Sequence, residues 1–198
     1  MTEVFDAANE VQAFLLARRW PFCFIGGVAV QRWGEQRATD DVDLTLLTGF
    51  SGEEVFVDEL LTHFPGRRTD ERAEALRSRV VFLVAPNGVN VDVALGALPF
   101  EADAVDRSSD WELSPGKRLR TCSAEDLLVH KCFANRDRDW TDVDGILIRQ
   151  WGKLDMKRVR RELRPLAELK ESPDILPRLD KLLARLGQSK VLPKWDGM

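Results

Sequence analysis

Apolar positions recur along this chain with two different periods. In residues 3–19 they fall three or four positions apart, which predicts an amphipathic helix. Short apolar runs, several with the alternating period of a strand, precede a stretch in which only the helical period continues. Strands are expected at 22–25, 41–47, 79–85, 89–95, 111–113 and 117–122, and further helices at 28–33, 52–64, 123–135, 140–151, 155–170 and 174–187.

Turn residues separate two of the predicted strands. Pro-Asn-Gly at 86–88 lies between the runs 79–85 and 89–95, so these two runs are expected to form a β-hairpin. Residues 97–110 are expected to be a loop with a short helical turn. The charged residues 66–78 have no clear period and receive no assignment.

The distribution of these elements predicts an α+β fold. Residues 1–120 would form a core with a mixed β-sheet flanked by helices, and residues 121–198 a helical region packed on it. The hydrophobic content of 44% and charged content of 31% are typical of a globular protein. No apolar run of about 18 residues could cross a membrane. The acidic N-terminus lacks the features of a signal peptide, so a cytoplasmic location is expected.

Charge is unevenly distributed along the chain. Residues 1–110 carry a net charge of −9 and residues 111–198 one of +5, within a total of −4. A basic region can face a polyanion, and the basic run at 157–164 would suit RNA. Because solvated faces of amphipathic helices produce the same distribution, the charge pattern leaves both interpretations open.

The cysteines and histidines suggest little chemistry of their own. Cys23, Cys122 and Cys132 are widely spaced in apolar surroundings, which predicts reduced, partly buried thiols. His63 and His130 are too few for a histidine-based zinc site. A cysteine nucleophile with a histidine base is compatible with the composition, but no local sequence signature supports it.

Two predicted strands carry carboxylates in positions that could converge. Asp41 and Asp43 are two residues apart and therefore share one face of their strand, whereas Asp40 would give a register that breaks this alternation. Asp92 lies in the run 89–95, on the face opposite to its valines. If the strands are neighbours, three carboxylates meet and repel unless a cation lies among them. Mg²⁺ or Mn²⁺ would suit these oxygen ligands, although an isolated D-x-D is most often surface acid.

A glycine pair follows the strand expected at 22–25. Gly26 and Gly27 would let backbone N–H groups approach a phosphate closely, and the next helix would add the positive end of its dipole. A plain tight turn is the simpler explanation. Because no G-x-G-x-x-G and no G-K-[ST] is present, the pattern fits neither a Rossmann fingerprint nor a Walker A loop.

Taken together, these residues resemble the nucleotidyltransferase superfamily of DNA polymerase beta. The shared pattern is a glycine pair, a D-x-[DE] after a short gap and a third carboxylate on a later strand. Arg37 and Thr39 extend the match, because R-x-T-x-D-x-D-L is similar to the AbiEii-like toxins of type IV toxin–antitoxin systems. The resemblance implies a nucleotidyltransferase core that binds Mg²⁺ or Mn²⁺ through the carboxylates and a nucleotide near the other matching residues. The pattern falls on Gly26, Gly27, Asp41, Asp43 and Asp92.

A second block, at 125–146, resembles the helical motif of the same family. Its lysine falls on Lys131, and its R-D-x-x-D on Arg138, Asp139 and Asp142. The resemblance implies that the lysine contacts the nucleotide phosphates and that the R-D-x-x-D completes the nucleotide pocket. Pairing of charges on a helix surface is the alternative, because the two aspartates are three residues apart. The two blocks together cover about residues 20–150.

The function implied by the resemblance is a metal-dependent transfer of an NMP from an NTP to an acceptor hydroxyl. RNA, a protein or a small molecule could supply that hydroxyl, and a toxin role would add a cognate antitoxin as partner. Two alternatives stay open. The sequence Asp-Val-Asp-Leu-Thr at 41–45 also fits the D-x-D-x-T of haloacid-dehalogenase-like phosphatases. A non-catalytic nucleotide-binding or antitoxin-like protein would keep the fold without turnover.

Overall fold

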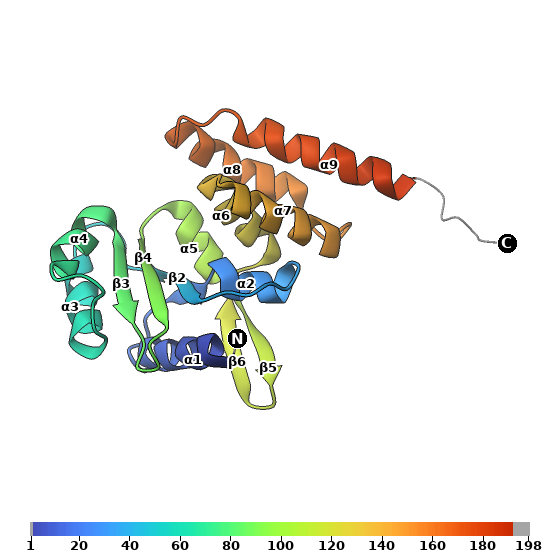
Figure 1. Ribbon diagram of the computed structural model, residues 1–198. Helices are drawn as coiled ribbons and strands as arrows, with labels where there is room; N and C mark the ends of the chain where they lie inside the picture. The colour runs from blue at the N-terminus through green and yellow to red at the C-terminus, as the bar shows by residue number, and fades with distance from the viewer. Residues whose placement is uncertain (1, 192–198) are drawn as a thin grey trace. The chain divides into compact units, whose positions relative to one another are not determined.

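The computed structural model describes residues 2–191 of the chain, so residues 192–198 of the predicted helical region lie outside the described residues. The described residues divide into two units. The first comprises the chain up to Arg32 together with Gln36–Ser123, and the second comprises Trp33–Glu35 together with the chain from Ala124 onward. Figure 1 shows both units, with labels on most of their helices and strands.

The first unit contains a mixed β-sheet. Within the described residues it has six strands in the order β3-β4-β2-β1-β6-β5. The neighbours β2 and β4 are parallel, as are β1 and β6, while the other adjacent pairs are antiparallel. The strands are β1 (Phe22–Phe24), β2 (Asp41–Leu47), β3 (Val80–Val84), β4 (Asn90–Gly96), β5 (Ser109–Ser114) and β6 (Lys117–Thr121).

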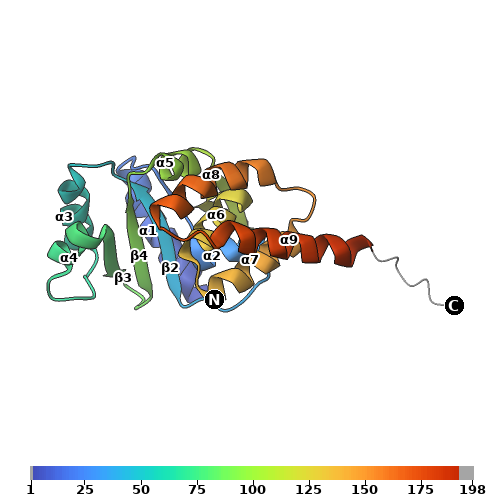
Figure 2. The same ribbon diagram turned by 90° about the horizontal axis from the view of Figure 1, so that it is seen from above.

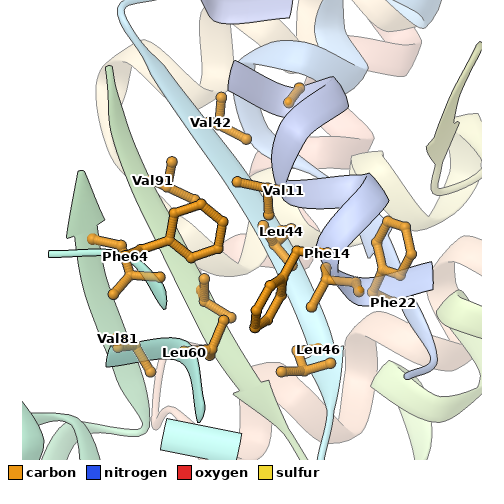
Figure 3. Packing of buried hydrophobic residues seen from close by; sticks show 14 of the residues in the cluster. Val11, Phe14, Phe22, Val42, Leu44, Leu46, Leu60, Phe64, Val81 and Val91 are labelled. Atoms are coloured by element: carbon orange, nitrogen blue, oxygen red, sulfur yellow. The ribbon is translucent and has the colours of Figure 1, made fainter. Parts of the chain in front are cut away.

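Helices cover one face of this sheet and bury the main core. Figure 3 shows Val11 and Phe14 of α1 packed over Leu44 of β2, with Leu60 of α3 alongside. Burying one such aliphatic or aromatic side chain contributes about 1.5–3 kcal/mol, which is why the strands alternate apolar and polar residues. The helices of this unit are α1 (Thr2–Ala17), α2 (Gly26–Trp33), α3 (Glu53–His63), α4 (Glu71–Ser78) and α5 (Pro99–Asp106).

The opposite face of the sheet carries α5 at one end and the start of α2 farther along. A Cβ atom added at Gly96 would lie 2.8 Å from Cγ2 of Thr45 and 3.4 Å from Cβ of Glu101, so α5 packs closely on β2 and β4 there. The start of α2 approaches the Asp43 side of β2, as described below. The polar face of β2 is therefore covered at its C-terminal end by α5.

Several sequence predictions are confirmed and one is wrong. The hairpin β3–β4 forms around Gly88, which adopts a left-handed φ of +84°. The unassigned segment 66–78 contains α4. Residues 97–110 were expected to be a loop with a short helical turn, and the extent of that turn was wrong, because it is the eight-residue helix α5. The Glu101 carboxylate accepts hydrogen bonds from the N–H groups of Ala97 and Leu98, both at 2.8 Å, and caps the start of this helix.

The second unit is helical, as predicted. Figure 2 gives a second view of its helices. Buried apolar side chains such as Leu127, Val143 and Val159 line the contacts among them. No helix in the described part of the chain is long and apolar enough to cross a membrane. The helices are α6 (Ala124–Ala134), α7 (Asp137–Arg149), α8 (Met156–Leu169) and α9 (Ile175–Val191).

The basic run at 157–164 lies on α8 and is largely engaged within the second unit. Arg158 pairs with Glu125 at 2.8 Å and Arg160 pairs with Asp180 at 2.6 Å. Arg161 contacts the neighbouring carboxylate of Glu162. These ion pairs favour the interpretation of a solvated helix face over that of an RNA-binding surface.

Candidate active site

The parallel strands β2 and β4 bring the predicted carboxylates to one face of the sheet. Asp43 and Asp92 are register partners, and Asp41 lies two residues earlier on β2, with its side chain on the same face. Val42 and Leu44, between and beyond the two aspartates, point into the core. The neighbouring strands that convergence of the carboxylates requires are therefore present.

The environment of Asp92 disfavours its negative charge. Burial is the largest cause of a pKa raised above the usual value for this carboxyl group. The negative charges of Asp41 and Glu71 raise the pKa further, whereas the positive charge and hydrogen bond of Arg67 lower it. Asp92 thus lies in a locally acidic environment that Arg67 only partly neutralises.

The glycine pair is explained by how closely two side chains approach its backbone. Gly26 has a left-handed φ of +53°, and a Cβ atom there would lie 1.9 Å from Oδ2 of Asp43. A Cβ atom at Gly27 would lie 2.1 Å from Oγ1 of Thr39. The N–H of Gly27 also donates a hydrogen bond to Oδ2 of Asp43 at 3.4 Å. The helix α2 begins at Gly26 itself, so the pair forms the first residues of the helix.

Thr39 and Arg37 precede β2 in the chain, and Thr39 contacts a candidate site residue. The buried Thr39 hydroxyl donates a hydrogen bond to Oδ1 of Asp41 at 3.1 Å. The Arg37 guanidinium donates to the carbonyl oxygen of Ala38 at 3.0 Å, and its own carbonyl accepts a hydrogen bond from the Gln31 side chain. Thr39 thus orients a candidate metal ligand, and the predicted nucleotide contacts of both residues stay predictions.

The donor chemistry at this face fits a hard divalent cation, but the side chains are held by protein donors. Among the residues that the structure describes, no three Asp, Glu, His or Cys side chains are arranged to bind one ion as they stand. Asp41 is held by Thr39, Asp43 by Gly27, and Asp92 by Arg67. Carboxylates sharing one sheet face are the oxygen ligands that Mg²⁺ and Mn²⁺ prefer. A metal site here remains a prediction and would need side-chain rotations.

The second predicted block forms a buried ion network in the second unit. Lys131 on α6 is 7% exposed, and its Nζ lies 2.8 Å from Oδ2 of Asp142 and 3.2 Å from Oδ1 of Asp139. The two aspartates are 4% and 1% exposed. They lie on α7 and converge on one ammonium group, which is more specific than charge pairing at a helix surface. Whether Lys131 also contacts phosphates stays a prediction.

Arg136, which the sequence analysis did not select, completes this network. Its Nε lies 2.6 Å from Oδ2 of Asp139, so two cations balance two carboxylates. Burial raises the pKa of Asp139, but the hydrogen bond from Arg136 and the charge of Lys131 outweigh it, so the pKa is lowered overall. Arg138 is exposed on α7 and pairs with no carboxylate of the described residues.

Two further residues near Asp92 also escaped the sequence analysis. Arg67 forms an ion pair with Asp92, and the charge of Glu71 contributes to the raised pKa of Asp92. Both lie in the segment 66–78, which showed no period. Their position depends on how β3 pairs with β4, so no local spacing could have identified them.

The cysteine alternative finds no support in the structure. Cys23, Cys122 and Cys132 are buried and form no disulfide within the described residues. Burial is the largest cause of a strongly raised pKa at Cys132, which keeps that thiol protonated and unreactive. The phosphatase alternative also fits poorly, because Asp41 is the first residue of β2 instead of following a buried parallel strand.

Comparison with known proteins decides the family. The family model described as "Nucleotidyl transferase AbiEii toxin, Type IV TA system" matches residues 16–189. The chain belongs to the AbiEii nucleotidyltransferase family. The match spans both sequence blocks and bears out the resemblance stated above, so the chain is a nucleotidyltransferase. No curated protein sequence matches it.

Solved structures show the same fold for this AbiEii-family chain. An antigenic nucleotidyltransferase-like protein from Paracoccidioides brasiliensis is 16% identical, with a TM-score of 0.53, over 91% of this chain and 93% of its own. The antibiotic-resistance factor ANT(2'')-Ia is 16% identical, with a TM-score of 0.56, over 86% of this chain and 94% of its own. At such low identity the likeness concerns the fold and carries no substrate to this chain.

Proposed function

We propose that this AbiEii-family nucleotidyltransferase transfers an NMP from an NTP to an acceptor hydroxyl at the face of β2 and β4. The observation that carries the proposal is the parallel register that pairs Asp43 with Asp92, with Asp41 on the same face. Asp41, Asp43 and Asp92 would hold Mg²⁺ or Mn²⁺. When bound, these ions would neutralise charge on the triphosphate and activate the attacking oxygen.

In the proposed reaction the acceptor oxygen attacks the α-phosphorus of the NTP. A new P–O bond forms, the bond to the β-phosphate oxygen breaks, and pyrophosphate leaves. Asp92 would accept the proton of the acceptor hydroxyl or orient that hydroxyl. Its raised pKa supports this role, because a carboxylate that holds a proton more readily is a better general base.

The remaining predicted residues would bind the nucleotide. The start of α2 at Gly26 and Gly27 would favour a phosphate through its dipole, and the Gly27 N–H, which donates to Asp43 in the structure, would have to turn to the phosphate. Lys131 and Arg138 would offset phosphate charge, while Asp139 and Asp142 would keep the ammonium of Lys131 in place. Arg37 and Thr39 would line the approach to Asp41.

Incubation with each α-³²P-labelled NTP, Mg²⁺ or Mn²⁺ and a cell extract tests the proposal. We expect labelled RNA, protein or small molecule to appear with the wild-type protein. Asp41→Asn and Asp43→Ala should each reduce the transfer by on the order of 100-fold or more, the scale on which loss of one charge-stabilising group acts.

Asp40→Asn is the matched control. Asp40 is exposed, precedes β2 and lies next to Asp41 in the chain. The substitution therefore removes the same charge as Asp41→Asn but alters no residue of the proposed site. Its transfer rate should stay near the wild-type value. If wild-type protein transfers no label to any acceptor, the non-catalytic nucleotide-binding alternative replaces the proposal; if Asp40→Asn is as inactive as Asp41→Asn, the assigned register is wrong.

The family description supports two finer proposals, a toxin role and a cognate antitoxin as partner. Neither proposal names the acceptor, and the label-transfer assay identifies the chemical class of the acceptor directly. We also propose a cytoplasmic location, which would give the enzyme access to NTPs.

A further inference from the structure

An arginine that is not part of the family pattern forms an ion pair with Asp92, the third carboxylate of the proposed site. Arg67 forms an ion pair with Asp92 through its Nη2 atom. Its backbone N–H donates a hydrogen bond to the carbonyl oxygen of Phe82 at 2.9 Å, and its guanidinium carbon lies 4.6 Å from the centroid of the Phe82 ring. Phe82 is the register partner of Asp92 on β3. Backbone and aromatic contacts therefore fix Arg67 beside Asp92.

A buried carboxylate with one free oxygen lies close by. Glu71 begins α4 and is 3% exposed. Its Oε1 accepts a hydrogen bond from the N–H of Phe82 at 2.7 Å, whereas its Oε2 is buried and has no hydrogen-bond partner among the described residues. A buried carboxylate oxygen without a donor is costly, so this group favours the arrival of a cation or a hydrogen-bond donor.

We propose that Arg67 is the resting counter-ion of Asp92 and moves to Oε2 of Glu71 when a divalent cation binds at the three aspartates. The inference rests on the proposed function, because it assumes that cation. In the structure Arg67 already pairs with Asp92, one of the three carboxylates that would have to hold the cation. Arg67 and Glu71 are positioning residues that act through Asp92.

The contacts of Phe82 make this exchange feasible. Phe82 holds Arg67 through its carbonyl oxygen and ring, and it holds Glu71 through its N–H. In the proposed exchange the guanidinium changes carboxylates and the Arg67 backbone keeps its hydrogen bond to Phe82. The resting ion pair lowers the apparent affinity for the cation, since only molecules with Asp92 released can bind it.

Titration of the protein with Mn²⁺ alone tests the inference without any turnover. The electron paramagnetic resonance signal of the unbound ion reports how much Mn²⁺ the protein has bound. Arg67→Gln should bind Mn²⁺ about three- to tenfold more tightly than wild type, the range expected for removing a partly exposed competing ion pair. Arg67→Lys keeps the charge and should return the affinity toward the wild-type value.

Arg68→Gln is the matched control. The Arg68 guanidinium carbon also lies 4.6 Å from the centroid of the Phe82 ring, but this side chain pairs with Glu74 at 3.4 Å instead of with Asp92. Its removal changes the local charge equally and should leave Mn²⁺ affinity within about twofold of wild type, because the exchange does not involve it. Equal tightening in the two variants would overturn the inference in favour of a general charge effect.

Glu71→Gln separates the proposed role of Glu71 as acceptor of the Arg67 guanidinium from its structural contact with Phe82. The glutamine can still accept the hydrogen bond of the Phe82 N–H, but it cannot receive the guanidinium as a carboxylate. We expect weaker Mn²⁺ binding in the single variant and no further weakening when Glu71→Gln is added to Arg67→Gln. If Glu71→Gln weakens binding equally in both backgrounds, Glu71 acts only through its charge and the exchange is refuted.

Asp92→Asn distinguishes failure of this inference from failure of the proposed function. If Asp92→Asn binds Mn²⁺ as well as wild type does, the three aspartates are not the metal site and both proposals fail. If Mn²⁺ binding depends on Asp92 while Arg67→Gln leaves the affinity unchanged, the metal site stands and Arg67 is not its counter-ion. Circular dichroism confirms that each variant is folded.

Discussion

The central residues of the site constrain one another through contacts that leave no spare volume. Gly26 and Gly27 are required because the carboxylate of Asp43 and the hydroxyl of Thr39 lie where their Cβ atoms would be. The same hydroxyl then orients Asp41. The glycines and the D-x-D therefore depend on each other sterically, quite apart from any phosphate.

This dependence predicts different outcomes for two glycines with a left-handed φ. Gly88→Ala has nothing within 4 Å of its new Cβ and should cost only the backbone strain of about 1–2 kcal/mol. Gly26→Ala introduces the same strain and also displaces Asp43. Its free energy of unfolding should therefore fall by about 1–3 kcal/mol more, and most of the transfer activity should be lost. Urea unfolding and label transfer measure both effects, and equal behaviour of the two variants would contradict the steric account.

The buried network around Lys131 predicts a large effect on stability. Lys131→Met removes the ammonium group that both buried aspartates, Asp139 and Asp142, contact, which should cost about 3–5 kcal/mol in the free energy of unfolding. Arg138→Met removes an exposed cation from the same region and should change stability by less than about 0.5 kcal/mol. Comparable urea midpoints for the two variants would show that the network contributes little.

At the scale of the elements, the pairing of β2 with β4 creates the site. Alternation along each strand was readable from the sequence, and so were the hairpin β3–β4 and the helical second unit. That β2 and β4 are neighbours was not readable, because 48 residues lie between Asp41 and Asn90 in the sequence although the two are register partners. The resemblance to a known family supplied what local patterns lack.

The elements that the sequence analysis missed are those whose contacts are not local. The helix α5 was expected only as a short helical turn within a loop. Its cap is the Glu101 side chain, which folds back onto the N–H groups of Ala97 and Leu98 and gives no periodic signal in the sequence. Arg67 and Glu71 gain their place beside Asp92 only through Phe82 on β3. No periodicity in residues 66–78 encodes that position.

The burial of Asp92, on β4 between β2 and β3, predicts a pH-dependent loss of folding stability. Because burial raises its pKa in the folded protein, the ionised carboxylate opposes folding at neutral pH, and this cost disappears as the pH falls through the raised pKa. Asp92→Asn should therefore be at least as stable as wild type at pH 7, with the difference narrowing in acid, while transfer is lost. Urea unfolding between pH 4 and 7 checks this, and a variant less stable than wild type at pH 7 would contradict it.

For the molecule as a whole, the family assignment predicts a measurable effect on growth. The match over residues 16–189 covers both units, so the toxin role is proposed for the entire chain. Expression of the wild-type protein in a bacterial host without its partner should arrest growth, and Asp40→Asn should do the same. Asp41→Asn should permit growth at equal protein levels. Normal growth with abundant, folded wild-type protein would contradict the toxin role.

The proposed active site requires a cation to contact three aspartate side chains from two strands. Crystals grown with Mn²⁺ and a non-hydrolysable NTP test this most directly, because anomalous scattering locates the ion independently of the protein atoms. We predict a strong anomalous peak in contact with carboxylate oxygens of Asp41, Asp43 and Asp92. The phosphates of the NTP should lie beside the start of α2. A bound NTP whose Mn²⁺ lies away from these aspartates would contradict the account.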